Sequence, residues 1–487
     1  MQLLQQTAPG ELERQWVEEY GTVTRISSFA GQPAFLVSDP RALQYVMNEK
    51  VDKFPKGKDI DVFGMALIGQ GLTVVSGQAH LRQRRILTPA FSTSMTRAWA
   101  ELFQDHGEKM VGKIKTQIEE DSSIDILKWT TKLALDALGL SLFRHHFGAI
   151  DGADVPITRE IQNALHVAAT ETGIFDLMVA MLAIHLPKSA AKWLAQAPTA
   201  ASRALNKYRR FSYKFAAEVM KAALNNPKNE QKDDVVGLLT SSSHAVDKEQ
   251  RLQMDEVLAQ MSTFLLAGQE TTASSQAVLA YMIATHPADQ QRLRAEVQAM
   301  YAKKPLNEPL APADYDKLPF LNAVIKENLR LYTTVHTMTR QVVANEIIPV
   351  AYPVTLEDGS KTSTIPVKKG DRLLLSLQTY NRLPSVWGED AAEWNPNRFL
   401  DGRPIDSNIG LFGNVMTFSS GVRGCLGWKF AIIELQVTTA LLVKNFELSA
   451  IPTERMKLLT SNFFLIPGVE GKEEEGSQVR LRCKTID

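Results

Sequence analysis

The stretch from Phe418 to Val443 constrains this chain more than any other, because it joins a glycine-rich loop with one cysteine to an apolar helical segment. Residues 428–443 contain no Gly or Pro, and their apolar residues recur at helical spacing. Cys425 is therefore expected at the N-terminus of a helix. Free backbone N–H groups and the positive end of the helix dipole favour a thiolate over a thiol at such a position.

The residues around Cys425 suit one kind of ligand. Gly421, Gly424 and Gly427 let the backbone turn tightly and approach a flat ligand closely, and Arg423 can reach an anionic group beside that ligand. A thiolate in this setting suits an axial haem ligand better than a zinc site, which would need more ligands. Two structural alternatives stay open: a buried cysteine, or a disulfide with Cys483, the only other cysteine.

The longest helical candidate runs from Met254 to His286. It carries no charge from Val257 to Gln269, and the next residue is Glu270, followed by two threonines. A carboxylate inside an apolar helix is costly unless it is paired or neutralised. Ala267 and Gly268 have small side chains, so a ligand can lie against the backbone and the helix can open locally. The alternative is a surface helix whose polar face begins at Glu270.

Composition limits the classes of function. The chain has 54 Lys and Arg against 54 Asp and Glu, a balance that argues against a general nucleic-acid binder. Two cysteines in 487 residues do not make a disulfide scaffold, so a reducing compartment is expected. The length alone suggests roughly three domains, but no linker, repeat or low-complexity tract divides the chain. We therefore expect residues 1–487 to form a single catalytic domain.

Strand-like and helix-like sequence patterns alternate along the chain, and together they predict a mainly α fold. Residues 21–38 alternate in polarity around a Gly-Gln-Pro turn and read as a hairpin, and residues 341–378 form a second β region. Most of 40–340, and again 426–446, reads as helix. We expect one large α-rich body with a small β region packed at its edge.

The cysteine loop resembles the haem-binding signature of the cytochrome P450 family, Phe-x-x-Gly-x-Arg-x-Cys-x-Gly, with every fixed position filled. The segment from Ala267 to Thr272 is similar to the oxygen-activation motif of that family and also matches throughout. The resemblance covers nearly the whole chain. In the general character of its sequence, rather than in any one motif, the chain is most similar to fungal microsomal members. It implies a triangular helical body with haem b, iron protoporphyrin IX, between the long central helix and the cysteine-loop helix. It further implies that Cys425 is the metal ligand and that the other motif residues contact the haem: Phe418, Gly421, Gly427, Ala267 and Gly268.

The same resemblance implies an activity. It places Thr271 beside dioxygen and Glu270 next to a water chain, where a hydroxyl and a carboxylate can relay protons as general acids. The implied enzyme is a haem-thiolate monooxygenase that inserts one atom of dioxygen into a small, largely apolar organic substrate. Electrons would come from NADPH through NADPH–cytochrome P450 reductase. A peroxygenase or isomerase-type member without electron transfer stays open, as does a non-catalytic haem sensor.

Glu327 and Arg330 stand three residues apart on one helical face, where they can pair. They resemble the Glu-x-x-Arg motif of the family, whose third partner would be Arg398. The chain departs from the pattern twice. Asn397 stands where Glu is usual, and Thr333-Thr334 stand where two prolines are usual. The two threonines predict a looser chain leading into Val335 to Met338, beside the substrate.

Cationic groups are expected to hold the two haem propionates. Arg423 belongs to the cysteine loop, and Arg340 lies where family members often place a propionate arginine. His80 and Arg84 match a Trp-x-x-x-Arg pattern in which His80 replaces the tryptophan. Charge-assisted bonds suit such carboxylates. Arg82 and Arg85, on the same helix, offer either a basic surface to an acidic reductase or a plain solvated face.

Membrane attachment is an expectation from the resemblance alone. The sequence shows no signal peptide and no apolar run long enough to span a bilayer. Eukaryotic members usually carry an N-terminal anchor and a proline-rich hinge, so we expect a truncated anchor and a monomer on the cytoplasmic face of the endoplasmic reticulum membrane. Without an anchor the protein would be cytoplasmic. Ile174 to Leu186 is expected to face a membrane or guard the substrate entrance, with a buried core helix as the alternative.

Overall fold

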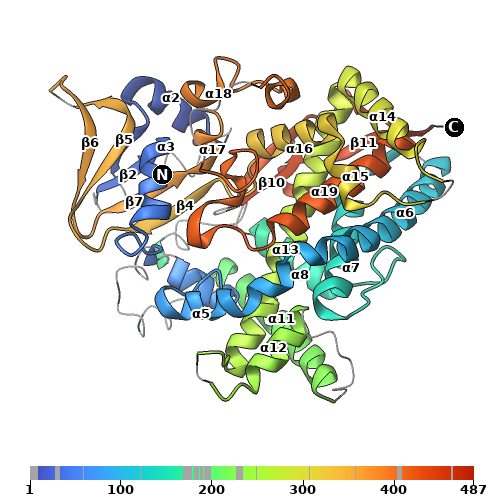
Figure 1. Ribbon diagram of the computed structural model, residues 1–487, viewed down its shortest axis with the longest axis horizontal. Coiled ribbons are helices and arrows are strands. Elements are labelled where there is room, and N and C mark those ends of the chain that lie inside the picture. The colour runs from blue at the N-terminus through green and yellow to red at the C-terminus, as the bar shows by residue number, and fades with distance from the viewer. Residues whose placement is uncertain are drawn as a thin grey trace.

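The computed structural model has a roughly triangular outline in which helices fill most of the body, and the larger group of strands lies at one corner while the others lie among the helices (Figure 1). It describes residues 9–27, 33–58, 60–120, 122–167, 178–179, 182, 186, 190, 199–225, 234–247, 249–305, 308–356, 358–402, 409–461 and 464–486. This arrangement confirms the predicted α-rich body with a small β region at its edge.

The predicted helices around the site are present. The long candidate is α13, Met254–Thr285, and the segment after the cysteine loop is α19, Trp428–Asn445. His80 and Arg84 lie on α5, Gly77–Leu87. The other helices are α2 (Glu11–Tyr20), α3 (Pro40–Gln44), α4 (Met65–Leu67), α6 (Thr96–Glu120), α7 (Ile126–Phe143), α8 (Pro156–His166), α11 (Ala200–Asn225), α12 (Val235–Ser243), α14 (Pro287–Tyr301), α15 (Pro312–Asp316), α16 (Pro319–Leu331), α17 (Leu377–Tyr380) and α18 (Pro384–Trp387).

Strands form small sheets. The first has the order β1 (Val23–Ser27), β2 (Pro33–Val37), β7 (Arg372–Ser376) and β4 (Thr337–Gln341). β1 and β2 are antiparallel with Val23 opposite Val37, which confirms the predicted hairpin, and β2 and β7 are parallel. The second predicted β region, residues 341–378, contains β7 and the hairpin of β5 (Glu346–Thr355) and β6 (Lys361–Val367), whereas β4 precedes this region and reaches only its first residue. The remaining sheets are β9 (Met456–Ser461) with β10 (Phe464–Val469), and β3 (Ser123–Asp125) with β11 (Arg480–Thr485) and β8 (Phe446–Ala450).

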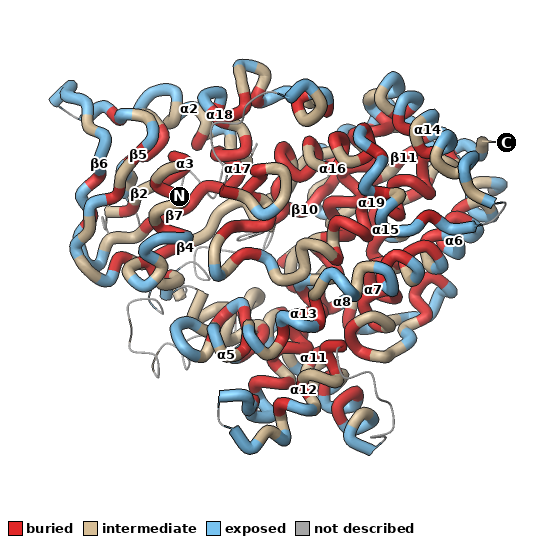
Figure 2. The backbone as a smooth tube through the Cα atoms, in the orientation of Figure 1, coloured by how far each residue is buried: buried red, intermediate tan, exposed pale blue. Residues whose placement is uncertain are grey.

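Helix α13 forms the centre of the core. A capping box fixes its start, because Gln253 and Glu256 bond each other's backbone N–H groups. Most of its side chains are buried, and it packs on α7, α11, α16 and α19 (Figure 2). The alternative of a surface helix is therefore wrong. Within the described part of the chain, no helix is both long and apolar enough to cross a bilayer.

The expectation for Ile174 to Leu186 falls largely outside the described residues. Two described side chains of this stretch, Met178 and Leu182, are 58% and 53% exposed. Neither of them is part of a buried core, so they give no support to the core-helix alternative.

Candidate functional site

The cysteine loop is closed by two backbone bonds. Cys425 N–H donates to Phe418 O at 2.8 Å, and Gly424 N–H donates to Gly421 O at 3.0 Å. Gly421 has a φ of +64°, and a Cβ atom there would lie 2.4 Å from Met47 O. Only glycine fits such a position without strain. Helix α19 begins three residues after Cys425, with Gly427 at its N-cap.

The Cys425 thiol is free. Its side chain is accessible, yet the protein around it desolvates the sulfur and raises the pKa of the thiol. The Gly427 N–H and the charge of Arg84 lower this pKa, but burial outweighs them. The start of the helix therefore favours the thiolate as expected, through the Gly427 N–H, but desolvation is the larger effect and the net direction is upward. Cys483 is free and buried on β11, which removes the disulfide alternative.

A stripe of accessible residues interrupts the buried helix α13. Ala267 is exposed, and Gly268 and Thr271 are partly exposed, whereas their neighbours along the helix are buried. Residues four apart share a helical face. The ring of Phe264, on the same face one turn earlier, lies 5.5 Å from the ring of Phe91. Phe91 in turn lies next to Gly427. This face of α13 is therefore directed towards the cysteine loop.

The two small residues of α13 have different roles. A Cβ atom at position 268 would lie 2.5 Å from Leu138 Cδ1, so Gly268 lets α7 pack closely. Ala267 is the small residue whose side chain is accessible. The expectation that both residues are small for a ligand therefore needs correcting, because the missing side chain of Gly268 makes room for Leu138 of α7.

Glu270 is buried within α13 and 8% exposed. Its Oε1 atom has no hydrogen-bond partner among the described residues. Burial raises the pKa of this carboxyl to about 7. Thr271, the next residue, donates its hydroxyl to Ala267 O at 2.5 Å. A buried acid that titrates near neutral pH beside an accessible hydroxyl is suited to moving protons.

The predicted propionate residues form a cluster of basic side chains, to which the structure adds Lys56. Burial lowers the pKa of Arg423, and the charge of Arg84 lowers it further. Burial, Arg423 and Arg340 together lower the pKa of Lys56 well below its usual value. We refer to Lys56, His80, Arg84, Arg340 and Arg423 as the basic cluster.

His80 corrects one expectation. Burial, then the charges of Arg423, Lys56 and Arg84, lower the pKa of its imidazole to about 3. It is therefore a neutral hydrogen-bonding group at physiological pH and not a cation. Nothing in the sequence indicated that Lys56 belongs to this cluster. It joins the cluster because its backbone forms a β-bridge with Arg340, far along the chain.

The bonds of the basic cluster go mainly to backbone carbonyls. Arg84 Nη1 donates to Gly424 O at 2.8 Å, Arg423 Nη1 to Val75 O at 3.2 Å, and Arg340 Nη1 to Thr339 O at 2.8 Å. Lys56 Nζ donates to Thr73 O. Asp61 is the carboxylate that acts on Lys56 and Arg423.

The chemistry of these residues fits a haem. Several desolvated bases that act against one another match a ligand that brings its own negative charges, such as two propionates. Among the described residues, no three His, Cys, Asp or Glu side chains converge as a metal site. A single accessible cysteine therefore fits a metal that a macrocycle holds on its other sides.

The third predicted group forms a closed, buried network. Glu327 and Arg330 are fully buried and joined by two bonds, 2.7 Å from Nε to Oε2 and 2.8 Å from Nη2 to Oε1. Arg398 lies 3.5 Å from Glu327 Oε1 and 2.9 Å from Asp390 Oδ1. The departure at Asn397 leaves this network intact, because Asn397 Oδ1 instead accepts a bond from Arg292 at 2.8 Å.

The expectation that Thr333-Thr334 is loose is wrong. Thr333 Oγ1 accepts a bond from Asn381 Nδ2 at 2.8 Å and lies 3.2 Å from Thr417 Oγ1. Thr334 is tied to α13 through Ser275, at 3.1 Å between the hydroxyl oxygens. Side-chain hydrogen bonds hold this connection in place.

Arg82 and Arg85 are paired, which limits their use as a free basic surface. Arg82 Nη2 donates to the buried carboxylate of Glu256. Arg85, which is exposed, donates to Glu249 O at 2.9 Å and lies 3.5 Å from the carboxylate of Glu249.

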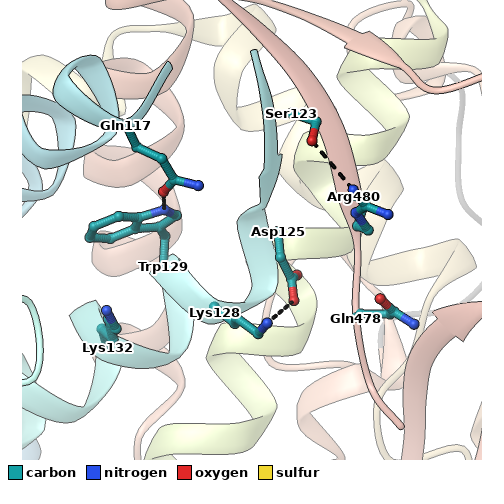
Figure 3. A pocket seen from close by; sticks show the side chains of 8 residues that line it. All are labelled: Gln117, Ser123, Asp125, Lys128, Trp129, Lys132, Gln478 and Arg480. Atoms are coloured by element: carbon teal, nitrogen blue, oxygen red, sulfur yellow. Dashed lines mark hydrogen bonds and ion pairs between the residues drawn. The ribbon is translucent and has the colours of Figure 1, made fainter. Parts of the chain in front are cut away.

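A surface pocket of about 430 Å³ lies apart from all these residues (Figure 3). Strand β3, β11 and the first turns of α7 contribute to its lining: Gln117, Ser123, Asp125, Lys128, Trp129, Lys132, Gln478 and Arg480. Many of its polar groups bond each other, as Trp129 Nε1 does to Gln117 Oε1 at 3.0 Å. None of the predicted site residues lines it.

Comparison with known proteins gives independent evidence. The family model described as Cytochrome P450 matches residues 1–471. Cytochrome P450 monooxygenase 205 of Postia placenta is 30% identical over 491 residues, covering 97% of this chain and 88% of that protein. The ganoderic acid synthetase of Ganoderma lucidum is 29% identical and covers 89% of this chain and 83% of its own length. Cytochrome P450 monooxygenase claQ of Ampulloclitocybe clavipes is 27% identical, covering 98% and 89%.

Proposed function

The chain belongs to the cytochrome P450 family of monooxygenases, and from this premise we propose the reaction that it carries out. It inserts one atom of dioxygen into a small, largely apolar organic molecule, with electrons from NADPH delivered by NADPH–cytochrome P450 reductase. The observation that carries the proposal is the position of the Cys425 loop opposite the accessible stripe of α13, with Glu270 and Thr271 at that stripe.

The basic cluster and the cysteine loop would hold haem b. When bound, the haem supplies the iron that activates dioxygen, and a thiolate ligand favours cleavage of the O–O bond. Cys425 is the metal ligand. Arg423, Arg340, Arg84 and Lys56 hold the carboxylates as cations, and His80 acts as a neutral donor. The other contacts would be Phe418, Gly421, Gly427, Ala267 and the backbone of Gly268, whose side-chain position faces Leu138.

Glu270 and Thr271 move the protons that oxygen chemistry needs. Because the pKa of Glu270 is about 7, a large fraction of its carboxyl is protonated at neutral pH and can donate a proton. The accessible hydroxyl of Thr271 can pass that proton to a water or reactant at the stripe. Such a relay is needed when electrons arrive one at a time with dioxygen, so its presence favours a monooxygenase over a peroxygenase.

We further propose that residues 1–487 act as one catalytic unit, as a monomer at a membrane surface on the cytoplasmic side of the endoplasmic reticulum. The exposed apolar side chains of Met178 and Leu182 support such a contact. Binding of the purified protein to vesicles of neutral phospholipid tests this. The double variant Met178→Ser, Leu182→Ser should bind less, and equal binding would contradict the proposed surface.

The reduced carbon monoxide spectrum of Cys425→Ser tests the central assignment. Oxygen in place of sulfur removes the soft anionic donor, so the variant should bind haem weakly and lose the thiolate-type band. Cys483→Ser is the matched control, because Cys483 lies on β11 away from the loop, and it should keep the band. A thiolate-type band in the Cys425 variant would remove Cys425 from the role of ligand.

A further inference from the structure

Helix α13 is held firmly one turn beyond Thr271 by side chains from other parts of the fold. The hydroxyl oxygens of Ser275 and Thr334 lie 3.1 Å apart, and Asn328 Nδ2 of α16 donates to Ser275 O at 3.1 Å. Thr130 of α7 donates its hydroxyl to Ala273 O at 3.0 Å. All of these side chains are buried.

The preceding turn of α13, which carries Thr271 and Thr272, forms side-chain hydrogen bonds within its own helix. Thr271 and Thr272 donate their hydroxyls to carbonyls of their own helix, Ala267 O at 2.5 Å and Gly268 O at 3.3 Å. Bonds of this type weaken the regular helix and often bend it. The accessible stripe therefore lies on a turn that its own side chains perturb, and the next residue on the same face, Ser275, is where the fold restrains it.

Thr334 is itself fixed on both sides. Its carbonyl accepts a bond from Leu465 N–H of β10 at 2.8 Å. The preceding residue, Thr333, bonds Asn381 and lies beside Thr417, which immediately precedes the Phe418 of the cysteine loop. Thr333 and Thr334 together thus connect the two sides of the candidate site: Thr333 contacts the residue before the loop that carries Cys425, and Thr334 contacts the helix that carries Thr271.

We propose that Thr334 is a positioning residue that, through its hydrogen bond to Ser275, fixes the location of the Thr271 hydroxyl relative to the Cys425 loop. This inference rests on the proposed function, because it concerns how well protons and dioxygen are handled at the stripe. The hydroxyl carries this role. The backbone contact of Thr334 with Leu465 is independent of the side chain.

The test is the stability of the reduced, haem-loaded protein towards air. Stopped-flow mixing with air-saturated buffer gives the rate at which the ferric absorbance spectrum returns, and no substrate is needed. Thr334→Val keeps the shape of the side chain and removes the bond, so the rate should rise about threefold to fivefold, the ratio that corresponds to one lost hydrogen bond. Thr334→Ser keeps the hydroxyl and should return the rate to the wild-type value. Thr271→Ala removes the hydroxyl that is being positioned, so its rate should be the largest in the series.

A double-mutant cycle separates positioning from general destabilisation. Ser275→Ala should raise the rate as much as Thr334→Val, and the double variant should raise it no further, because both remove one interaction. Thr285→Val is the matched control. It removes a hydroxyl near the end of α13, where Thr285 Oγ1 donates to Tyr281 O of the same helix at 3.1 Å, and should leave the rate unchanged.

Rates equal to wild type in Thr334→Val and Ser275→Ala, or effects that multiply in the double variant, would overturn the inference. The proposed function fails differently. In that case the wild-type protein itself would lack the thiolate-type carbon monoxide band or take no electrons from the reductase.

Discussion

Two groups of buried charges in this protein differ in how their charge is balanced. In the network around Glu327, two guanidinium groups, Arg330 and Arg398, pair with two carboxylates, Glu327 and Asp390, and the pair of Glu327 with Arg330 is fully buried. In the basic cluster, the charge of Arg84 acts against that of Arg423, and the charges of Arg423 and Arg340 act against that of Lys56. A group whose charges are balanced internally supports the fold, whereas a group with excess charge is built for a ligand that supplies the opposite sign.

Breaking the balanced network should have the largest effect. Glu327→Ala leaves Arg330 buried without the carboxylate that it pairs with, while Arg398 keeps only Asp390. Such a loss costs on the order of 3–5 kcal/mol. The variant should be recovered mostly as aggregated or haem-free protein, measured as soluble yield and haem content. Glu393→Ala is the control, because Arg330 uses only the carbonyl of this exposed residue. Normal yield with full haem content for Glu327→Ala would show that the network is not needed for folding.

Glu270 differs from both groups, because it is a single buried acid whose Oε1 atom has no hydrogen-bond partner among the described residues. Its pKa is raised in the folded state, so the folded protein binds more protons than the unfolded chain between pH 4.5 and about 7. Stability should therefore fall relative to Glu270→Gln as the pH rises through this range, by on the order of 3 kcal/mol in total, and the difference should level off above pH 7.

Thermal midpoints of both proteins from pH 5 to pH 8 measure this difference. Exposed Glu389→Gln serves as the control and should track the wild type throughout. A constant gap between wild type and Glu270→Gln would mean that Glu270 titrates normally and is not a neutral acid in the folded protein.

The basic cluster should give the smallest effect, and its sign should depend on the ligand. Lys56→Gln removes one of the mutually repelling charges, so the haem-free protein should become more stable. The haem-loaded protein should release haem faster, by about fivefold, which is roughly 1 kcal/mol of a charge-assisted contact. The thermal midpoint of the haem-free form and the rate of haem transfer to apomyoglobin measure the two effects. Exposed Lys58→Gln should change neither. Loss of stability in both forms would place Lys56 with the balanced group.

The sequence predicted those parts of the site that lie within short motifs. The Cys425 loop, the stripe on α13 and the pair of Glu327 with Arg330 depend on spacings of a few residues, which local geometry turns into fixed positions. The fold class followed from the same periodicities. Arg398 was also found, because the resemblance supplied the distant partner.

Features that depend on tertiary packing could not be predicted. Lys56 reaches the basic cluster only because residues 53–56 pair with the end of β4. The threonines at 333 and 334 look flexible in a sequence and are fixed by Asn381 and Ser275. The pKa of Cys425 was predicted from the helix end alone, whereas desolvation, which requires knowing what surrounds the sulfur, decides its direction.

The arrangement around Glu327 also bears on how such a protein can evolve. One oxygen of this carboxylate, Oε1, serves Arg330, Arg398 and the backbone N–H of Asn395 together. A substitution of Glu327 alone would leave several of these donors without their acceptor at once, so we expect its replacement to require simultaneous changes at its partners. The hydroxyl of Thr333 is open to gradual change, because it shares its contacts with Asn381 and Thr417, which also bond each other at 3.2 Å. New specificities are therefore expected to arise through substitutions after α16 while its last turns stay fixed.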